Sequence, residues 1–141
     1  MPAADVFLDS NVLVYALSDA PRERPKRDRA LALITEEAFG TSYQVLMETW
    51  VAAAYKIAKP VAADKVAAFL ERILVFPCVS ATPDLYRRAF VLASRYGIHP
   101  YDAAIVAGAH ELDARILYTE DLNDGQVYGE VRVVNPFAGI G

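Results

Sequence analysis

The amino-acid sequence predicts one α/β domain in which helices cover a mainly parallel sheet. The chain has 141 residues, a length that suits a single hydrophobic core. Hydrophobic residues make up 55% of it and charged residues 23%, which is typical of a globular protein. Short apolar runs alternate with segments of helical periodicity, and this alternation favours parallel strands joined by helices. We therefore expect a single domain over residues 1–141.

The composition also excludes some classes of protein. Apolar runs stay below the roughly 18 residues of a membrane span, and the N-terminus lacks a basic region followed by an apolar stretch. Cys78 is the single cysteine, so packing rather than an internal disulfide must supply stability. These features predict a cytoplasmic, unexported protein. A net charge of -4 argues against a surface that binds nucleic acid over its whole area.

The N-terminal segment predicts a strand and then a helix. Residues 5–9 (DVFLD) form a short apolar run with polar ends, which suits a buried strand. Residues 11–18 have helical length and spacing. The next segment, 21–29 (PRERPKRDR), is broken by prolines and carries more basic than acidic residues. We expect a solvated loop there, with local nucleic-acid binding as the alternative.

A second and a third helix are expected on either side of a very short strand. Residues 29–39 predict a helix that ends at a Gly40 cap and has three apolar residues on one face, Leu31, Ile34 and Ala38. Residues 39–42 (FGTS) leave room for only a short strand. Hydroxyl side chains suited to capping precede a helix predicted over 43–59, which must stop before Pro60.

The rest of the chain continues the alternation. One helix shows a clean amphipathic stripe, and another has Thr82 as N-cap, Pro83 at its first position and Gly97 after its last turn. A proline at position 136 ends the last strand. The expected helices cover 61–74, 83–96 and 100–114, and the expected strands cover 75–80, 115–119 and 130–136.

Four carboxylates occupy positions that this topology brings to one edge of the sheet. Asp9 lies at the carboxyl end of the first predicted strand and Asp121 just beyond the carboxyl end of the strand predicted over 115–119, and ligands bind outside the carboxyl ends of parallel strands. Glu48 and Asp102 each interrupt an apolar helix face, Asp102 in the first turn of its helix. Helices in a right-handed βα succession begin where strands end, so all four acids are expected to meet.

Such a cluster needs positive charge. Buried carboxylates repel one another, and no matching set of buried-looking lysines or arginines is visible in the sequence. A divalent metal is the simplest source of that charge, and all-oxygen ligands select Mg²⁺ or Mn²⁺ over Zn²⁺. Such an ion activates water and neutralises charge on phosphoryl oxygens. Hydrolysis of phosphodiesters is therefore the expected chemistry.

Four segments in order resemble the PIN-domain family and, within it, VapC-type toxins: FLDSNVLVYA, SYQVLMETWV, HPYDAAIVAGA and LYTEDLNDGQ. The likeness extends from residue 5 to about 136. It implies a three-layer α/β/α sandwich with a short, mainly parallel central sheet. It further implies a Mg²⁺- or Mn²⁺-dependent endoribonuclease, the toxin of a toxin–antitoxin pair. The implied partners are an RNA substrate and a cognate antitoxin protein, with no membrane, and a homodimer is expected.

The resemblance also assigns roles to individual residues. Catalytic and metal-binding roles fall on the four acids, Asp9, Glu48, Asp102 and Asp121. Asn11 and Thr119 match supporting residues that orient carboxylates or water. The last segment also contains Glu120 and Asp124. The T-x-D spacing selects Asp121 as the fourth acid, and Asp124 is a candidate for reaching a second ion or water. The hypothesis is in-line attack by an activated water that leaves a 5′-phosphate and a 3′-hydroxyl.

Other interpretations compete with this one. Asp9, Ser10 and Asn11 are all suited to capping the helix that follows, and His99 is suited to a turn or cap. A haloacid-dehalogenase-like phosphatase also begins with an aspartate at a strand end, but that family has D-x-D where this chain has Asn11. A catalytically silent PIN-like module that only binds partners is the third possibility.

Overall fold

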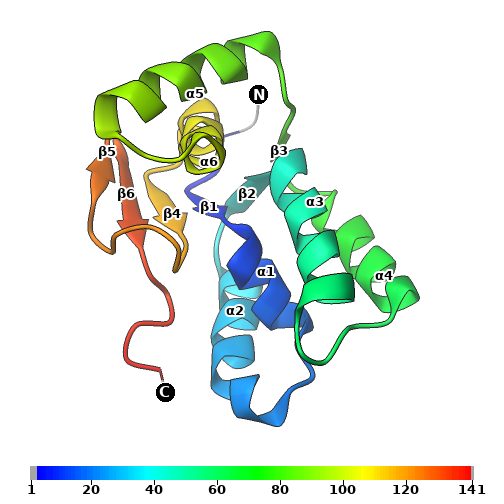
Figure 1. Ribbon diagram of the computed structural model, residues 1–141. Coiled ribbons are helices and arrows are strands. Elements are labelled where there is room, and N and C mark those ends of the chain that lie inside the picture. The colour runs from blue at the N-terminus through cyan, green and yellow to red at the C-terminus, as the bar shows by residue number, and fades with distance from the viewer. Residues whose placement is uncertain (1–2, 141) are drawn as a thin grey trace.

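Two α-helices separate each of the first three strands from the next, and the last three strands follow one another, as Figure 1 shows for residues 3–140, which the computed structural model describes. The helices are α1 (Ser10–Leu17), α2 (Arg24–Glu36), α3 (Tyr43–Val51), α4 (Ala63–Ile73), α5 (Pro83–Tyr96) and α6 (Pro100–Glu111). A 3-10 turn covers Pro21–Glu23 and a π-helical turn covers Ala52–Lys56. The strands are β1 (Val6–Leu8), β2 (Phe39–Ser42), β3 (Cys78–Val79), β4 (Ile116–Tyr118), β5 (Val127–Tyr128) and β6 (Val131–Val134).

The strands form one mainly parallel sheet, as predicted. Within residues 3–140 its order is β3-β2-β1-β4-β6-β5, and every neighbouring pair is parallel except β5 with β6. The central strand β1 pairs with β2 through Val6 and Phe39 and with β4 through Phe7 and Leu117. Because β1 and β4 are parallel neighbours, their carboxyl ends lie side by side.

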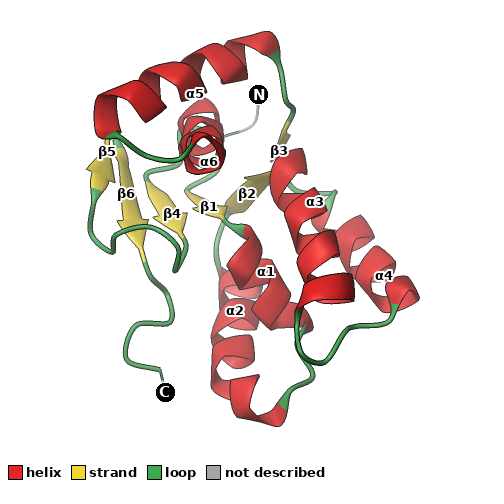
Figure 2. Ribbon diagram, in the orientation of Figure 1, coloured by secondary structure: helices red, strands yellow, loops and turns green. Residues whose placement is uncertain are grey.

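Helices cover both faces of the sheet, which confirms the expected α/β/α sandwich (Figure 2). Helix α6 packs on β1, β2, β4 and β6, and α5 packs on its outer side. On the opposite face α1 packs against α2 and α3. A Cβ atom at Gly108 would lie 3.1 Å from the ring of Phe7, so a glycine lets α6 approach β1 closely.

Several local signals in the sequence are confirmed. The side chains of Ser42 and Thr82 accept hydrogen bonds from the first turns of α3 and α5. Gly97 ends α5 with a left-handed φ of 64°. The short strand expected at 39–42 is present, and all four of its residues are buried. No helix formed by residues 3–140 has the length and apolar character that crossing a bilayer requires.

The interpretation of 21–29 as a loop is wrong. Residues 21–23 form a 3-10 turn and α2 begins at Arg24, so the basic segment is helical. Pro21 and Pro25 both fall in the first positions of these elements, where a backbone N–H has no intrahelical partner. The two prolines therefore start helices instead of excluding them.

Several other boundaries differ from the prediction, and the strand expected over 75–80 covers only Cys78–Val79. Helix α2 stops at Glu36, so Gly40 lies inside β2 instead of capping the helix, and Ala38 is exposed. The third helix ends at Lys56 through the π-helical turn rather than continuing to 59. The hairpin strand β5 was not predicted, because its two residues are too few to show a period.

Candidate active site

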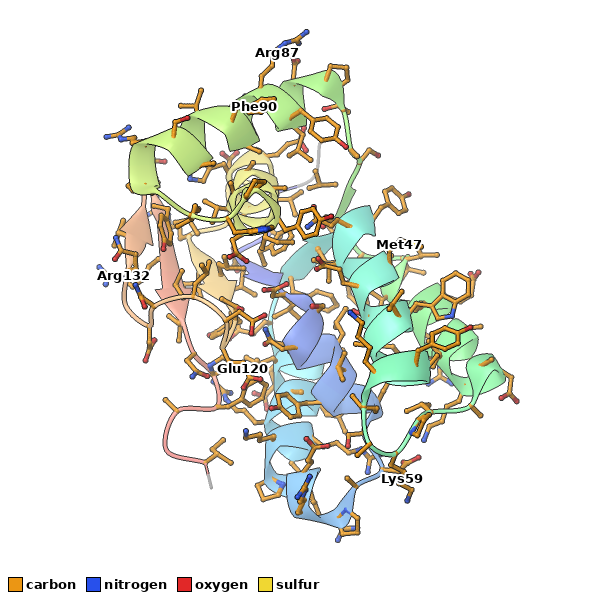
Figure 3. The ribbon with its side chains drawn as sticks, in the orientation of Figure 1. Met47, Lys59, Arg87, Phe90, Glu120 and Arg132 are labelled. Carbon is orange, nitrogen blue, oxygen red and sulfur yellow. The ribbon has the colours of Figure 1, made fainter. Side chains whose placement is uncertain are left out.

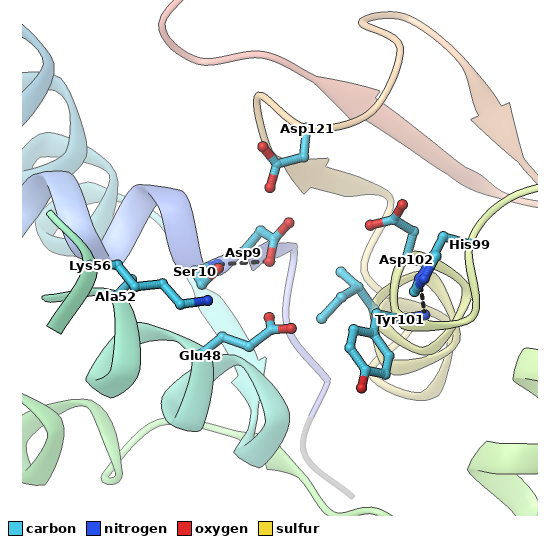
Figure 4. Close-up of a pocket in the computed structure, with 10 residues that line it drawn as sticks. Asp9, Ser10, Glu48, Ala52, Lys56, His99, Tyr101, Asp102 and Asp121 are labelled. Carbon is cyan, nitrogen blue, oxygen red and sulfur yellow. Dashed lines mark hydrogen bonds between the residues drawn. The ribbon is translucent and has the colours of Figure 1, made fainter.

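The four predicted acids line one cavity of about 320 Å³ at the carboxyl edge of the sheet (Figure 4). Asp9 follows β1, and Asp121 lies in the loop after β4. Glu48 projects from α3, and Asp102 from the first turn of α6. The chain topology thus brings together side chains that lie far apart in the sequence, as the order of strands and helices predicts.

Asp9 is the most constrained of the four. It is the N-cap of α1 and only 5% exposed. Its Oδ1 accepts a hydrogen bond from the Ser10 N–H at 2.7 Å, and its Oδ2 accepts one from the Thr119 hydroxyl at 2.8 Å. Asp9 is therefore a cap and a cavity residue at once, so the capping interpretation and the functional one are compatible.

Thr119 and Asn11 connect the first acid to the fourth. Thr119 is fully buried, and while its hydroxyl donates to Asp9 it accepts from the Asn11 Nδ2 at 3.0 Å and from the Asp121 N–H at 3.1 Å. The Asn11 Nδ2 also lies 3.3 Å from the Asp121 Oδ2. The two residues expected to support the site thus join the ends of β1 and β4 in one hydrogen-bond network.

Glu48 and Asp102 face the cavity from two helices. Glu48 is partly buried, and its Oε2 accepts a hydrogen bond from the Gln44 Nε2 at 3.4 Å. Asp102 is partly buried near His99, whose Nδ1 accepts from the Tyr101 N–H at 3.1 Å. His99 is the N-cap of α6, as the sequence suggested. Its ring also lines the cavity beside Asp102 (Figure 4).

Burial makes ionisation of these carboxylates costly. The pKa of Asp9 is raised to about 6, mainly by burial. The hydrogen bonds from Ser10 and Thr119 lower this pKa, and the charges of Asp121 and Glu48 raise it. Burial also raises the pKa of Glu48 and of Asp102, and repulsion from other acids of the cavity adds to both shifts. The cavity is therefore a place where added positive charge stabilises the protein.

The donor set fits a hard divalent cation. The cavity presents four carboxyl groups and no thiol, which favours Mg²⁺ or Mn²⁺ over softer metals. Among residues 3–140, however, no three acid, histidine or cysteine side chains lie close enough together to hold one ion. The carboxylates line a shared cavity but do not form one compact group of ligands.

Two other acids of the fourth segment do not line this cavity. The Asp124 Oδ1 accepts a hydrogen bond from the Asn135 N–H at 2.9 Å, which ties the loop to the end of β6. Glu120 accepts one from the Tyr15 hydroxyl at 3.0 Å. Both contacts are made within the fold and lie outside the cavity. They leave Asp121 as the acid of this loop that faces Asp9.

The sequence did not indicate every residue of the cavity. Ser10 and Lys56 line it too, and Lys56 is its basic side chain. The sequence offers no clear signal for Lys56, because it lies eight residues after Glu48 and a regular helix would turn it about 80° away from that residue.

Comparison with known proteins identifies relatives of this fold. The family model described as PIN domain matches residues 6–128. No curated protein sequence matches the chain. VapC20 from Mycobacterium tuberculosis, described as a toxin that cleaves the sarcin-ricin loop, has a TM-score of 0.65 and 21% identity, over 90% of this chain and 98% of that one. A toxin–antitoxin complex from Klebsiella pneumoniae has a TM-score of 0.67 and 20% identity, over 93% of this chain and 97% of that one. VapBC2 from Rickettsia felis, bound to a DNA fragment from its promoter, has a TM-score of 0.59 and 18% identity, over 91% of this chain and 96% of that one.

Proposed function

The chain belongs to the PIN-domain family, and from this we propose that it is a Mg²⁺- or Mn²⁺-dependent endoribonuclease, the toxin of a VapBC-type toxin–antitoxin pair. The observation that carries the proposal is the cavity lined by Asp9, Glu48, Asp102 and Asp121. Carboxylate oxygens suit a hard cation, and a hard cation in an acidic cavity suits hydrolysis at phosphorus. The toxin descriptions of similarly folded proteins support the same activity.

The chain's own residues have distinct tasks in this proposal. Asp9, Glu48, Asp102 and Asp121, which line the cavity, would hold the divalent ion or ions. When bound, the metal lowers the pKa of water and stabilises charge on the phosphate. Thr119 fixes the Asp9 carboxylate through its 2.8 Å hydrogen bond, and Asn11 fixes the Asp121 side of the site. Both oxygens of Asp9 already accept a hydrogen bond, so its orientation is set before substrate arrives.

RNA cleavage by the purified protein tests this function. We expect wild-type protein to cut single-stranded RNA with Mn²⁺ or Mg²⁺ and to stop when a chelator removes the metal. Asp9→Asn and Asp102→Asn should each lower the rate at least about 100-fold, because each removes a charged metal ligand. Asp64→Asn, an exposed acid on α4, is the matched control. Cleavage by the two cavity variants at the wild-type rate, with folding intact, would show that the activity is a contaminant.

The competing functions make different predictions. In a phosphatase of the D-x-D type, position 11 would be a second acid, whereas here the Asn11 amide donates to Thr119 and Asp121. Transfer of a phosphoryl group from a donor to Asp9 would support the phosphatase. A silent module would neither bind Mn²⁺ at neutral pH nor cut RNA.

The proposal includes protein partners. A cognate antitoxin follows from the toxin–antitoxin complexes among the similar structures. A second copy of the chain is proposed from an apolar groove of about 660 Å³ between α3, α5 and the start of α6. Glu48 and Tyr101 line both this groove and the acid cavity, so a protein seated in the groove borders the candidate active site.

A further inference from the structure

The cavity of the four acids is also lined by Lys56, to which the proposed ribonuclease chemistry assigns no role. Lys56 lines the cavity together with Asp9, Ser10 and Glu48, and within the part of the chain that the structure describes no other lysine or arginine lines it. Its side chain extends from the end of the π-helical turn Ala52–Lys56 toward Ser10 and Glu48 (Figure 4). Among residues 3–140, no carboxylate lies within ion-pair distance of its Nζ. The ammonium group therefore faces the cavity without a direct ionic partner.

An unusual backbone feature places Lys56 there. In a regular α-helix the residue eight positions after Glu48 lies about 80° around the axis from it. From Ala52 the helix widens into a π-helical turn, in which the Ile57 N–H donates to the Ala52 carbonyl at 3.1 Å. The extra residue in this turn lowers the rotation per residue and brings Lys56 back to the side of Glu48. Single π-helical turns are frequent at functional sites.

A role as counter-charge for the acids does not account for this placement. Lys56 lowers the pKa of Glu48, but burial raises it by more, so the net shift is upward. Lys56 is exposed, and an exposed lysine needs no partner to be stable. An anion that enters the cavity, by contrast, meets four carboxylates and gains from a mobile positive charge. Lysine binds phosphate as such a point charge.

We propose that Lys56 binds a phosphate of the RNA backbone at the acid cavity and so positions the scissile bond against Asp9 and Glu48. This inference rests on the proposed ribonuclease function and adds a substrate-binding residue to it. The π-helical turn is the device that directs the lysine into the cavity.

The test compares Lys56→Gln and Lys56→Arg with Lys59→Gln. Lys59 lies three residues further along, is exposed and does not line the cavity (Figure 3). With single-stranded RNA and Mn²⁺, we expect Lys56→Gln to lower kcat/KM by about 10- to 100-fold, the effect of losing a hydrogen bond to a charged group. Lys56→Arg should retain most of the activity, and Lys59→Gln should stay within about twofold of wild type.

Binding supplies a second readout that a structural role would not change. In the non-cleaving Asp102→Asn background, the Kd for the same RNA is measured at several salt concentrations. Loss of one phosphate contact should weaken binding and reduce the slope of log K against log salt by about 0.7. Lys59→Gln in that background gives the reference slope.

Several outcomes overturn the inference. One is a Lys56→Gln variant with the same Kd, salt slope and kcat/KM as Lys59→Gln while wild type cleaves. Another is a variant that loses thermal stability but binds RNA unchanged, because Lys56 would then act only on the fold. A wild-type protein that neither binds nor cleaves RNA overturns the proposed function and this inference with it.

Discussion

At the scale of residues, the burial of Asp9 opposes the negative charge that a metal-binding role requires of it. Asp9 is almost fully buried, yet it must carry that charge if it is to hold a cation. The hydrogen bonds from Ser10 and Thr119 favour the charged form but do not offset burial, which raises the pKa to about 6. Without a bound metal, we therefore expect the protein to be less stable near neutral pH, where Asp9 is ionised, than it is when Asp9 is protonated.

The pH dependence of stability tests this claim. The pKa of Asp9 is about 6 in the folded state against 3.8 ordinarily, so between these values the folded protein binds the proton and the unfolded chain does not. The contribution of Asp9 to the free energy of unfolding is therefore greatest at acidic pH, below both pKa values, and it falls by about 3 kcal/mol as the pH rises past the folded-state pKa. We expect Asp9→Asn to remove this part of the dependence and to unfold at higher urea than wild type at about pH 7.5.

The measurement is urea unfolding with a chelator present, at about pH 4.5, 6 and 7.5. Asp28→Asn, an exposed acid of α2, is the control for removing a carboxylate as such. Raised pKa values of Glu48 and Asp102 act in the same direction, so a smaller slope remains in Asp9→Asn. If wild type and Asp9→Asn lose stability in parallel over this range, burial does not disfavour the charge of Asp9.

The sequence indicated the four acids that line the cavity and did not indicate the lysine that lines it with them, for a physical reason. Asp9 and Asp121 follow strands, and Glu48 and Asp102 interrupt apolar faces, so topology and periodicity are enough to indicate them. Lys56 reaches the cavity only because the helix widens at Ala52. No residue type marks a π-helical turn, and a 3.6-residue period places Lys56 elsewhere.

At the scale of elements, the predictions succeeded where caps and periodicity agreed. Thr82, Pro83 and Gly97 gave both ends of α5 correctly. The prolines of 21–29 suggest a loop in the sequence, but they lie at positions where helices tolerate proline. Gly40 suggests a helix cap because glycine often follows helices. Packing decides its role instead, since β2 passes close to α6, and packing between distant segments is not visible in a local pattern.

Replacement of Gly40 tests that packing. A Cβ atom there would lie 2.4 Å from the Leu112 Cδ1, 3.0 Å from the Pro77 carbonyl oxygen and 3.3 Å from the Ala4 Cβ. Leu112 is fully buried and cannot move aside freely. We expect Gly40→Ala to lower the free energy of unfolding by about 1–3 kcal/mol, the usual cost of overpacking. Chemical denaturation measures it.

Leu112→Val provides the matched background. Shortening this side chain removes the closest atom, so Gly40→Ala should cost less there, with only partial rescue because the Pro77 carbonyl remains. A double-mutant cycle gives the coupling between the two sites. If Gly40 were a helix cap, as its place in the sequence suggests, Leu112→Val would leave the cost of Gly40→Ala unchanged.

At the scale of the whole molecule, two neighbouring hollows have opposite character. The acid cavity is polar, whereas the groove between α3 and α5 is lined mainly by apolar side chains. Tyr86 and Phe90 stand beside this groove with 63% and 72% of their surface exposed. Exposed apolar patches with rings of this size mark protein interfaces.

The arrangement favours a second copy of the chain as the occupant of the groove. Exposed rings line the groove itself, so two copies related by a twofold axis can each pack these rings against the groove of the other. We expect wild type to have the mass of two chains in light scattering after gel filtration. Phe90→Ser should shift the mass to one chain, because it removes a large exposed ring that lines the groove (Figure 3).

Val75→Ser is the control for this experiment. Val75 is 80% exposed in the segment after α4 and does not line the groove, so its removal should leave the dimer intact. A wild-type mass of one chain would contradict the dimer, and if the antitoxin then protected Phe90 from solvent, the groove would be its binding face instead. A Phe90→Ser protein that remains dimeric would place the interface elsewhere. Because Glu48 borders both hollows, each result also decides whether a second protein chain flanks the acid cavity.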